Sequence, residues 1–93
     1  MLEMIRLSLR LTNEEFDSEI ESLIEACKTD LQVAGVVNIA DDDPLILRAA
    51  TLYCKGHFGF ANIGADFLES YEMLKKVLCI SSKYNTLAGG SNV

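Results

Sequence analysis

Only a few residues in this sequence have side chains that could take part in catalysis or bind a metal ion. His57 is the only histidine, and no carboxylate or nucleophile lies at a recognisable catalytic spacing from it. The stretch Gly56–Gly59 lacks the glycine and lysine spacing of a phosphate-binding loop, and the sequence has no GxSxG or HExxH pattern. We therefore expect no enzyme activity, no catalytic residue and no cofactor.

The cysteines and a run of aspartates also have structural interpretations. The sequence has three cysteines, Cys27, Cys54 and Cys79, and no two of them form a CxxC motif. An odd number of cysteines does not fit a disulfide framework. Each lies in an apolar stretch, where a thiol behaves as a small hydrophobic group, so we expect a reducing compartment. Residues 41–43 are adjacent aspartates without the spaced ligands of a calcium loop. They indicate a helix cap, and we predict no bound metal ion.

The composition describes one small acidic domain. Ninety-three residues allow a single core, and the hydrophobic content of 49% is high for so short a chain. Such a surplus is often buried against a partner. The net charge of −6, with few clustered lysines and arginines, argues against DNA binding through the phosphates. The sequence shows no signal peptide and no apolar run that could span a bilayer, so we expect no membrane association and a cytosolic site of assembly.

Hydrophobic periodicity predicts an all-α protein, a small bundle of about four helices. Residues 2–11 fit a short helix that leads into an extended segment, which we favour, or a strand added to a neighbouring subunit's sheet. A capping box from Thr12 to Glu15, or Asn13 as the cap, predicts the start of a long helix. Gly35 is expected to end that helix, because glycine tolerates the left-handed conformation.

Two further helices are expected in the second half of the chain. Asp43 as N-cap and Pro44 in the first turn predict a helix to about His57. Because this helix is apolar on almost all sides, we expect it to be central or covered by another subunit. The last helix is expected over about residues 65–82, with an ion pair between Glu72 and Lys76. We assign residues 1–84 to one domain and residues 85–93 to a flexible tail.

The glycine-rich loop and the last helix supply the candidate interface residues. Glycines interrupt the helical pattern between residues 56 and 64, in a loop that is unusually apolar. Its apolar side chains either fold onto the core or contact a partner. The candidate interface residues are Phe58, Phe60 and Ile63 in this loop, with Tyr71 and Leu74 on the last helix.

Three segments carry a resemblance to a known family. They are LRLTNEEFDSEIESLIEACKTDL, an acidic helix after a Leu-Arg-Leu start; DDDPLILRAATLYCKGHFGFAN, an apolar helix that ends in an aromatic loop; and SYEMLKKVLCISSKY, the final helix. In this layout, residues 2–84 resemble the small head–tail connector proteins of tailed bacteriophages and prophages, which are also described as DNA-packaging or head-completion proteins. The resemblance includes no catalytic motif.

The resemblance implies a structural adaptor of virion assembly. Such a protein forms a homo-oligomeric ring on the portal protein, joins the head to the tail and lines the DNA exit channel. Its partners would be the portal protein, a tail-side completion protein and packaged DNA that passes without sequence-specific binding. It would lie at the virion head–tail junction after assembly in the cytoplasm of the bacterial host. The alternative is a small bacterial helical adaptor or regulator that binds a partner helix.

Overall fold

The computed structural model describes residues 1–58 and 64–86. These residues form helices and connections without a strand, which confirms the predicted all-α class. The helices are α1 (Leu2–Ser8), α2 (Asp17–Ala34), α3 (Pro44–His57), α4 (Gly64–Ile80) and α5 (Ser82–Asn85). The favoured helical interpretation is therefore confirmed for residues 2–8. The extended segment predicted after this helix is wrong, because Leu9, with a φ of −85° and a ψ of 2°, and Arg10, with a φ of 63°, form a turn. The short α5 departs from the prediction, in which a single helix runs to about residue 82.

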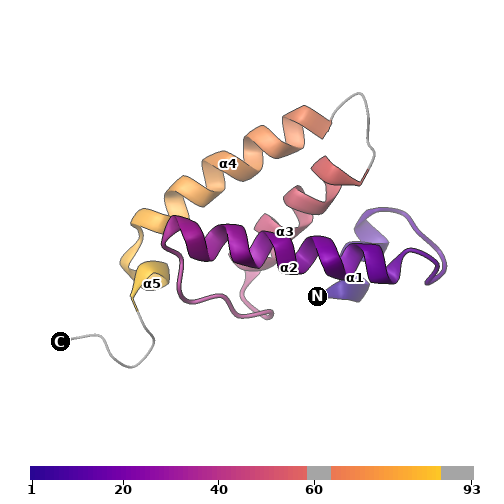
Figure 1. The fold of residues 1–93 in the computed structure, drawn as a ribbon, viewed down its shortest axis with the longest axis horizontal. Coiled ribbons are helices and arrows are strands. Elements are labelled where there is room, and N and C mark those ends of the chain that lie inside the picture. Colours follow the sequence, from indigo (N-terminus) through magenta and orange to yellow (C-terminus); the bar gives the residue numbers. More distant parts are fainter. Residues whose placement is uncertain (59–63, 87–93) are drawn as a thin grey trace.

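Helix α3 is the central helix of the bundle. It packs against α1, α2 and α4, whereas α1 and α4 do not touch each other within the described residues. Figure 1 shows α4 along one edge of the molecule, α2 nearer the viewer and α1 on the other side of α3. Ala49 and Ala50 of α3 are buried, and their small side chains allow neighbouring helices to approach. The prediction of a central third helix is confirmed.

The predicted boundaries at Gly35 and Asp43 are also confirmed. Gly35 ends α2 with a φ of 111°, in the left-handed region that favours glycine. The Asp43 carboxylate accepts hydrogen bonds from the backbone N–H groups of Leu45, at 2.9 Å, and Ile46, at 3.3 Å. Pro44 lies at the first helical position, where its missing N–H costs no hydrogen bond. Both signals act within a few residues, which explains why the sequence reveals them.

Helix α2 begins later than the sequence predicts. Its N-cap is Phe16, without a side-chain capping bond, and its first helical residue is Asp17. The Asn13 side chain accepts a hydrogen bond from the Glu15 N–H at 2.9 Å, which closes a turn ahead of the helix. The predicted capping box at Thr12, and Asn13 as the helix cap, are therefore wrong.

Contacts between distant segments account for the late start of α2. The Arg6 guanidinium of α1 donates to both carboxylate oxygens of Asp17, at 2.9 and 2.8 Å, and this hydrogen bonding lowers the pKa of Asp17. The Phe16 ring meets the Phe58 ring edge-on, with the centroids 5.5 Å apart. Arg10 turns the chain with a φ of 63°. These contacts fix the path of the connection, and the local capping signal does not.

Two glycines mark the closest approach of α3 and α4. Gly56 lies inside α3, and Gly64 is the first residue of α4, so neither belongs to the loop that the sequence predicts. A Cβ atom on Gly56 would lie 2.4 Å from the Leu68 side chain, and one on Gly64 would lie 3.0 Å from the Gly56 carbonyl oxygen. The glycines therefore serve close helix packing here.

Helix α5 is attached to the connection between α2 and α3. Tyr84 is 5% exposed, and its hydroxyl lies 3.0 Å from both carboxylate oxygens of Asp43. The backbone carbonyl oxygen of Tyr84 accepts hydrogen bonds from the backbone N–H groups of Val37, at 2.7 Å, and Asn38, at 3.1 Å. The Asn38 side chain donates to the carbonyl of Thr86 at 2.6 Å. The ordered contacts thus extend to Thr86, and residues 87–93 of the predicted tail lie outside the described residues.

Candidate interaction surfaces

The structure places the predicted interface residues in different environments. Tyr71 is buried, with 1% of its surface exposed, and Leu74 is half-buried against the core. Phe58 is also half-buried and packs against the core. Phe60 and Ile63 lie outside the described residues. The interface role of this set stays a prediction, while Phe58 and Tyr71 already have partners inside the chain.

Tyr71 is part of a polar cluster that joins α4 to α2. Its hydroxyl donates to the Asp30 carboxylate at 2.6 Å, and the Lys75 ammonium donates to the same oxygen at 2.9 Å. The Cys27 thiol lies 3.8 Å from the Tyr71 hydroxyl. Lys75 also pairs with Glu72 at 3.0 Å, so the predicted pair of Glu72 with Lys76 is wrong. The cluster satisfies the polar atoms at this helix contact.

The electrostatics of the cluster support a structural role. Burial raises the pKa of the Tyr71 hydroxyl, and its hydrogen bond to Asp30 raises it further. Burial opposes ionisation of Asp30, but the hydrogen bonds from Tyr71 and Lys75 outweigh it and lower the pKa of that carboxyl. Tyr71 therefore remains a neutral donor and Asp30 a charged acceptor at neutral pH.

Two of the cysteines are buried, whereas the histidine lies at the surface. Burial raises the pKa of the Cys27 thiol to about 11 and that of Cys54 to about 12, so both stay protonated and weakly nucleophilic at neutral pH. His57 is exposed, with its ring centroid 4.4 Å from that of Tyr53. Among the described residues, no group of three or more histidines, cysteines or acids could hold a metal ion.

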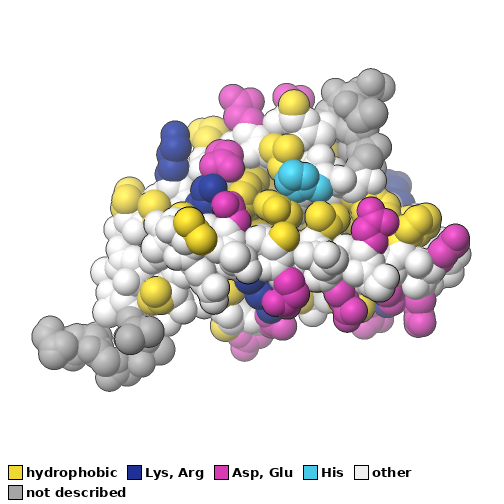
Figure 2. Space-filling model, in the orientation of Figure 1, with side chains coloured by type: hydrophobic (Ala, Val, Ile, Leu, Met, Phe, Trp, Pro, Cys, Tyr) yellow, Lys and Arg dark blue, Asp and Glu magenta, His cyan; other side chains and the backbone are white. Residues whose placement is uncertain are grey.

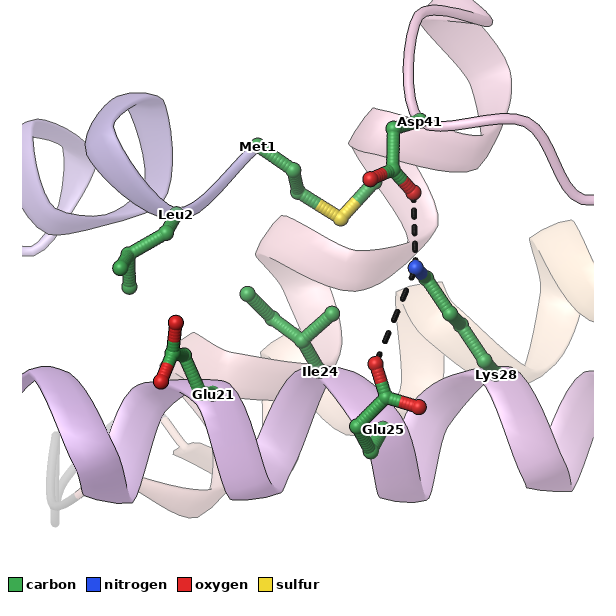
Figure 3. Close-up of a pocket in the computed structure, with 7 residues that line it drawn as sticks. All are labelled: Met1, Leu2, Glu21, Ile24, Glu25, Lys28 and Asp41. Carbon is green, nitrogen blue, oxygen red and sulfur yellow. Dashed lines mark ion pairs between the residues drawn. The ribbon is translucent and has the colours of Figure 1, made fainter.

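A hollow of about 470 Å³ lies between α1, α2 and the connection that precedes α3. Figure 3 shows Lys28 of α2 reaching toward Asp41, with Glu25 beside it. The Lys28 ammonium lies 2.7 Å from Asp41 and 3.9 Å from Glu25, and the hydrogen bond to Asp41 raises the pKa of Lys28. The cation at this hollow is thus paired within the chain.

The exposed apolar side chains form surfaces that the sequence analysis did not identify. On α4, Met73 is 64% exposed, Val77 55% and Ile80 78%. Tyr71 and Leu78 of the same helix are buried, so Val77 lies outside the core face although it is next to Leu78 in the sequence. The spacing of residues 73, 77 and 80 was the available signal, because residues four and three apart share a helix face.

A second apolar surface lies on the other side of the bundle, where α1 meets α3. Met4 is 59% exposed, Leu7 65% and Leu45 41%. Met4 also lines a groove of about 280 Å³, together with Ser8 of α1 and with Pro44, Leu47, Arg48 and Thr51 of α3. The exposed apolar side chains thus include one set on α4 and another on α1 and α3.

The charged side chains have a different distribution. Glu19, Glu21 and Glu25 of α2 are exposed, as are Asp41 and Asp42 in the following connection. Figure 2 shows acidic side chains along the lower edge of the molecule, over α2, and hydrophobic ones between α2 and α4. Exposed acidic side chains are thus frequent on α2 and in the connection that follows it.

Comparisons with known proteins identify the family. Within the described residues, no helix has both the length and the apolar character needed to cross a membrane. Neither the curated proteins nor the solved structures include a match to the chain. The family described as "Phage connector protein" matches residues 1–85, which include all five helices. The chain therefore belongs to the phage connector protein family.

Proposed function

We propose that this protein is a structural adaptor that forms a closed ring of identical subunits at the portal and joins the phage head to the tail. Phage connector proteins are structural components of the head–tail junction, and this chain belongs to their family. The observation that supports the ring is the pair of exposed apolar surfaces on α4 and at the α1–α3 groove. Exposed apolar patches of this kind mark protein contacts.

The proposed partners follow from the position in the virion. The portal protein would hold the ring on the head side, and a tail-side completion protein would bind its other end. Assembly would take place in the cytoplasm of the bacterial host. Phe58 and Leu74, which are half-buried in the single chain, and the predicted Phe60 and Ile63 are candidates for these contacts. No catalytic step is part of this role.

The acidic face of α2 is the proposed lining of the DNA channel. Glu21 and Glu25 are exposed and lie four residues apart, on one side of α2, and the chain carries a net charge of −6. Like charges repel, so an acidic wall would let DNA slide without binding to it. Replacing these glutamates by glutamine in the phage should slow DNA ejection. Unchanged ejection kinetics in a particle with normal ring content would contradict this lining.

The ring is tested by measuring the solution mass of the purified protein. Light scattering after gel filtration, over a concentration series and with and without the portal protein of the same phage, gives the number of bound copies. A large closed oligomer, or a monomer that the portal recruits in a fixed ratio, is expected. A monomer or dimer that ignores the portal at all concentrations would contradict the proposal and favour a cellular helical adaptor.

A further inference from the structure

The outer face of α4 is apolar, although its side chains are exposed and are not part of the hydrophobic core. Met73, Val77 and Ile80 are more than half exposed and follow one another at intervals of four and three residues. On a helix, this spacing places them in one stripe. The buried residues of α4, Tyr71 and Leu78, lie on the opposite side of the helix. This outer stripe is therefore apolar surface that remains after the bundle has formed.

The groove between α1 and α3 is the matching concave surface. Its volume is about 280 Å³, and it is lined mainly by apolar parts of Met4, Pro44 and Leu47. Leu7 and Leu45 are further exposed apolar residues on the same two helices. A groove of this kind can receive the apolar stripe of an amphipathic helix, read as anchors at i, i+4 and i+7.

The two surfaces cannot cover each other within one chain. α3 packs against α1 and against α4, and α1 and α4 make no contact within the described residues. Figure 1 shows α4 and α1 on different sides of the molecule. Between two copies, however, the stripe of one chain can meet the groove of another. A contact between two different surfaces is heterologous, and repeated rotation can close it into a ring.

Charges at the two surfaces favour a second copy of this chain as the occupant. Arg48 lines the groove and is exposed, and in the described part of the chain it has no carboxylate within 4.0 Å. Glu69 is exposed one helical turn before Met73, on the same outer face of α4. When Met73 enters the groove, Glu69 is positioned to meet the Arg48 guanidinium of the neighbour, which would fix the register of the contact.

We propose that the outer stripe of α4 in one copy packs into the α1–α3 groove of the next copy, with Glu69 paired to the neighbour's Arg48. This contact rests on the proposed ring and specifies the surfaces that build it. It needs no rearrangement of the described fold, since both surfaces are already exposed.

The first test is a charge exchange measured by light scattering, with and without the portal protein of the same phage. Arg48→Glu and Glu69→Arg should each weaken association by roughly thirtyfold or more. The double variant should recover most of the loss, because the pair is restored with reversed sign. Val77→Asp should abolish the oligomer, whereas the control Val33→Asp, at an 82% exposed apolar residue of α2, should leave it intact. Thermal unfolding followed by circular dichroism would show that all variants keep the fold.

The second test identifies which surfaces meet. In a Cys79→Ser background, Met4→Cys protein is mixed with Val77→Cys protein and treated with a short bismaleimide crosslinker. A crosslink between the two different variants supports the contact, and a crosslink of Val77→Cys protein with itself would overturn it in favour of a symmetric α4 pair. If the native protein forms a ring that Arg48→Glu and Val77→Asp leave unchanged, this contact is wrong and the ring remains. If the native protein forms no oligomer with or without the portal, the proposed function itself fails.

Discussion

The inner and outer faces of α4 differ although both are rich in apolar side chains. On the inner face, Tyr71 and Leu78 are buried, and the Tyr71 hydroxyl has a partner on α2. On the outer face, Val77 and Ile80 remain exposed. The inner face is already completed by α2 and α3, whereas the outer face has no partner helix in the described chain. Apolar content alone therefore does not distinguish a core face from a contact face; the position of neighbouring helices does.

This comparison also explains the high apolar content of so small a protein. A domain of this size buries a limited fraction of its surface, and exposed apolar groups are normal when they are scattered. Here three of them lie on one face of α4, and Met4 lines the groove between α1 and α3. Changes on the inner face should therefore act on stability, and changes on the outer face should act on assembly.

The largest effect is expected from Tyr71→Ala on the inner face. Loss of the buried ring should lower the free energy of unfolding by about 3–5 kcal/mol. Tyr71→Phe, which keeps the ring and removes the hydroxyl, should cost about 1–2 kcal/mol. Urea unfolding followed by circular dichroism measures both. The matched change on the outer face, Met73→Ala, should alter the free energy of unfolding by no more than about 0.5 kcal/mol. A loss as large as that of Tyr71→Ala would contradict the distinction between the two faces.

A smaller effect is expected from Gly56→Ala, where α3 meets the inner side of α4. The added methyl would lie 2.4 Å from the Leu68 side chain, so the helices must shift. We expect a loss of about 1–3 kcal/mol, although alanine is the better helix former. Ser70→Ala, at an exposed position of α4, is the control and should be neutral or slightly stabilising. A more stable Gly56→Ala protein would show that the approach at this glycine is not tight.

Asp30→Asn should produce a loss that depends on pH. The folded pKa of Asp30 lies below its ordinary value of 3.8, so its charge stabilises the fold above about pH 4, and this contribution is lost as the pH falls through the folded pKa. The Asp30 side chain is 37% exposed, so solvent screens the pair with Lys75, and we expect a loss of about 1 kcal/mol at pH 7.

Urea unfolding of the native and Asp30→Asn proteins at pH 7 and pH 3 measures this dependence. The difference between the two proteins should shrink at pH 3, because this pH lies below the ordinary carboxyl pKa of 3.8 and Asp30 of the unfolded native chain then takes up a proton. Asp42→Asn, at an exposed acid of the connection before α3, provides the control for a general loss of charge. A difference that stays constant between the two pH values would assign the stabilisation to the hydrogen bonds alone.

The smallest effect on stability is expected from Val77→Ser on the outer face. Because Val77 is 55% exposed, the free energy of unfolding should change by no more than about 0.5 kcal/mol. The same change one residue later, Leu78→Ser, removes a side chain with no exposed surface and should be strongly destabilising. Equal stability of the two variants in urea would mean that α4 is rotated relative to the described packing.

Local signals in the sequence determined much of the helical framework. The all-α class, the start of α3 at Asp43 and Pro44 and the end of α2 at Gly35 were predicted correctly. Capping, proline and left-handed glycine act through groups a few residues apart, so they can be read without a fold. The apolar character of α3 on almost all sides predicted either a central position or cover by another subunit, and the packing of α3 against α1, α2 and α4 shows the central position.

Only the tertiary structure decided how the faces of these helices are used. The late start of α2 depends on Arg6 of α1, and Lys75 was selected over Lys76 because it also reaches Asp30 of α2. The burial of Tyr71 and the exposure of Val77 likewise depend on where α2 and α3 lie around α4. Periodicity shows that residues share a helix face, but the direction of that face is set by packing between segments far apart in the chain.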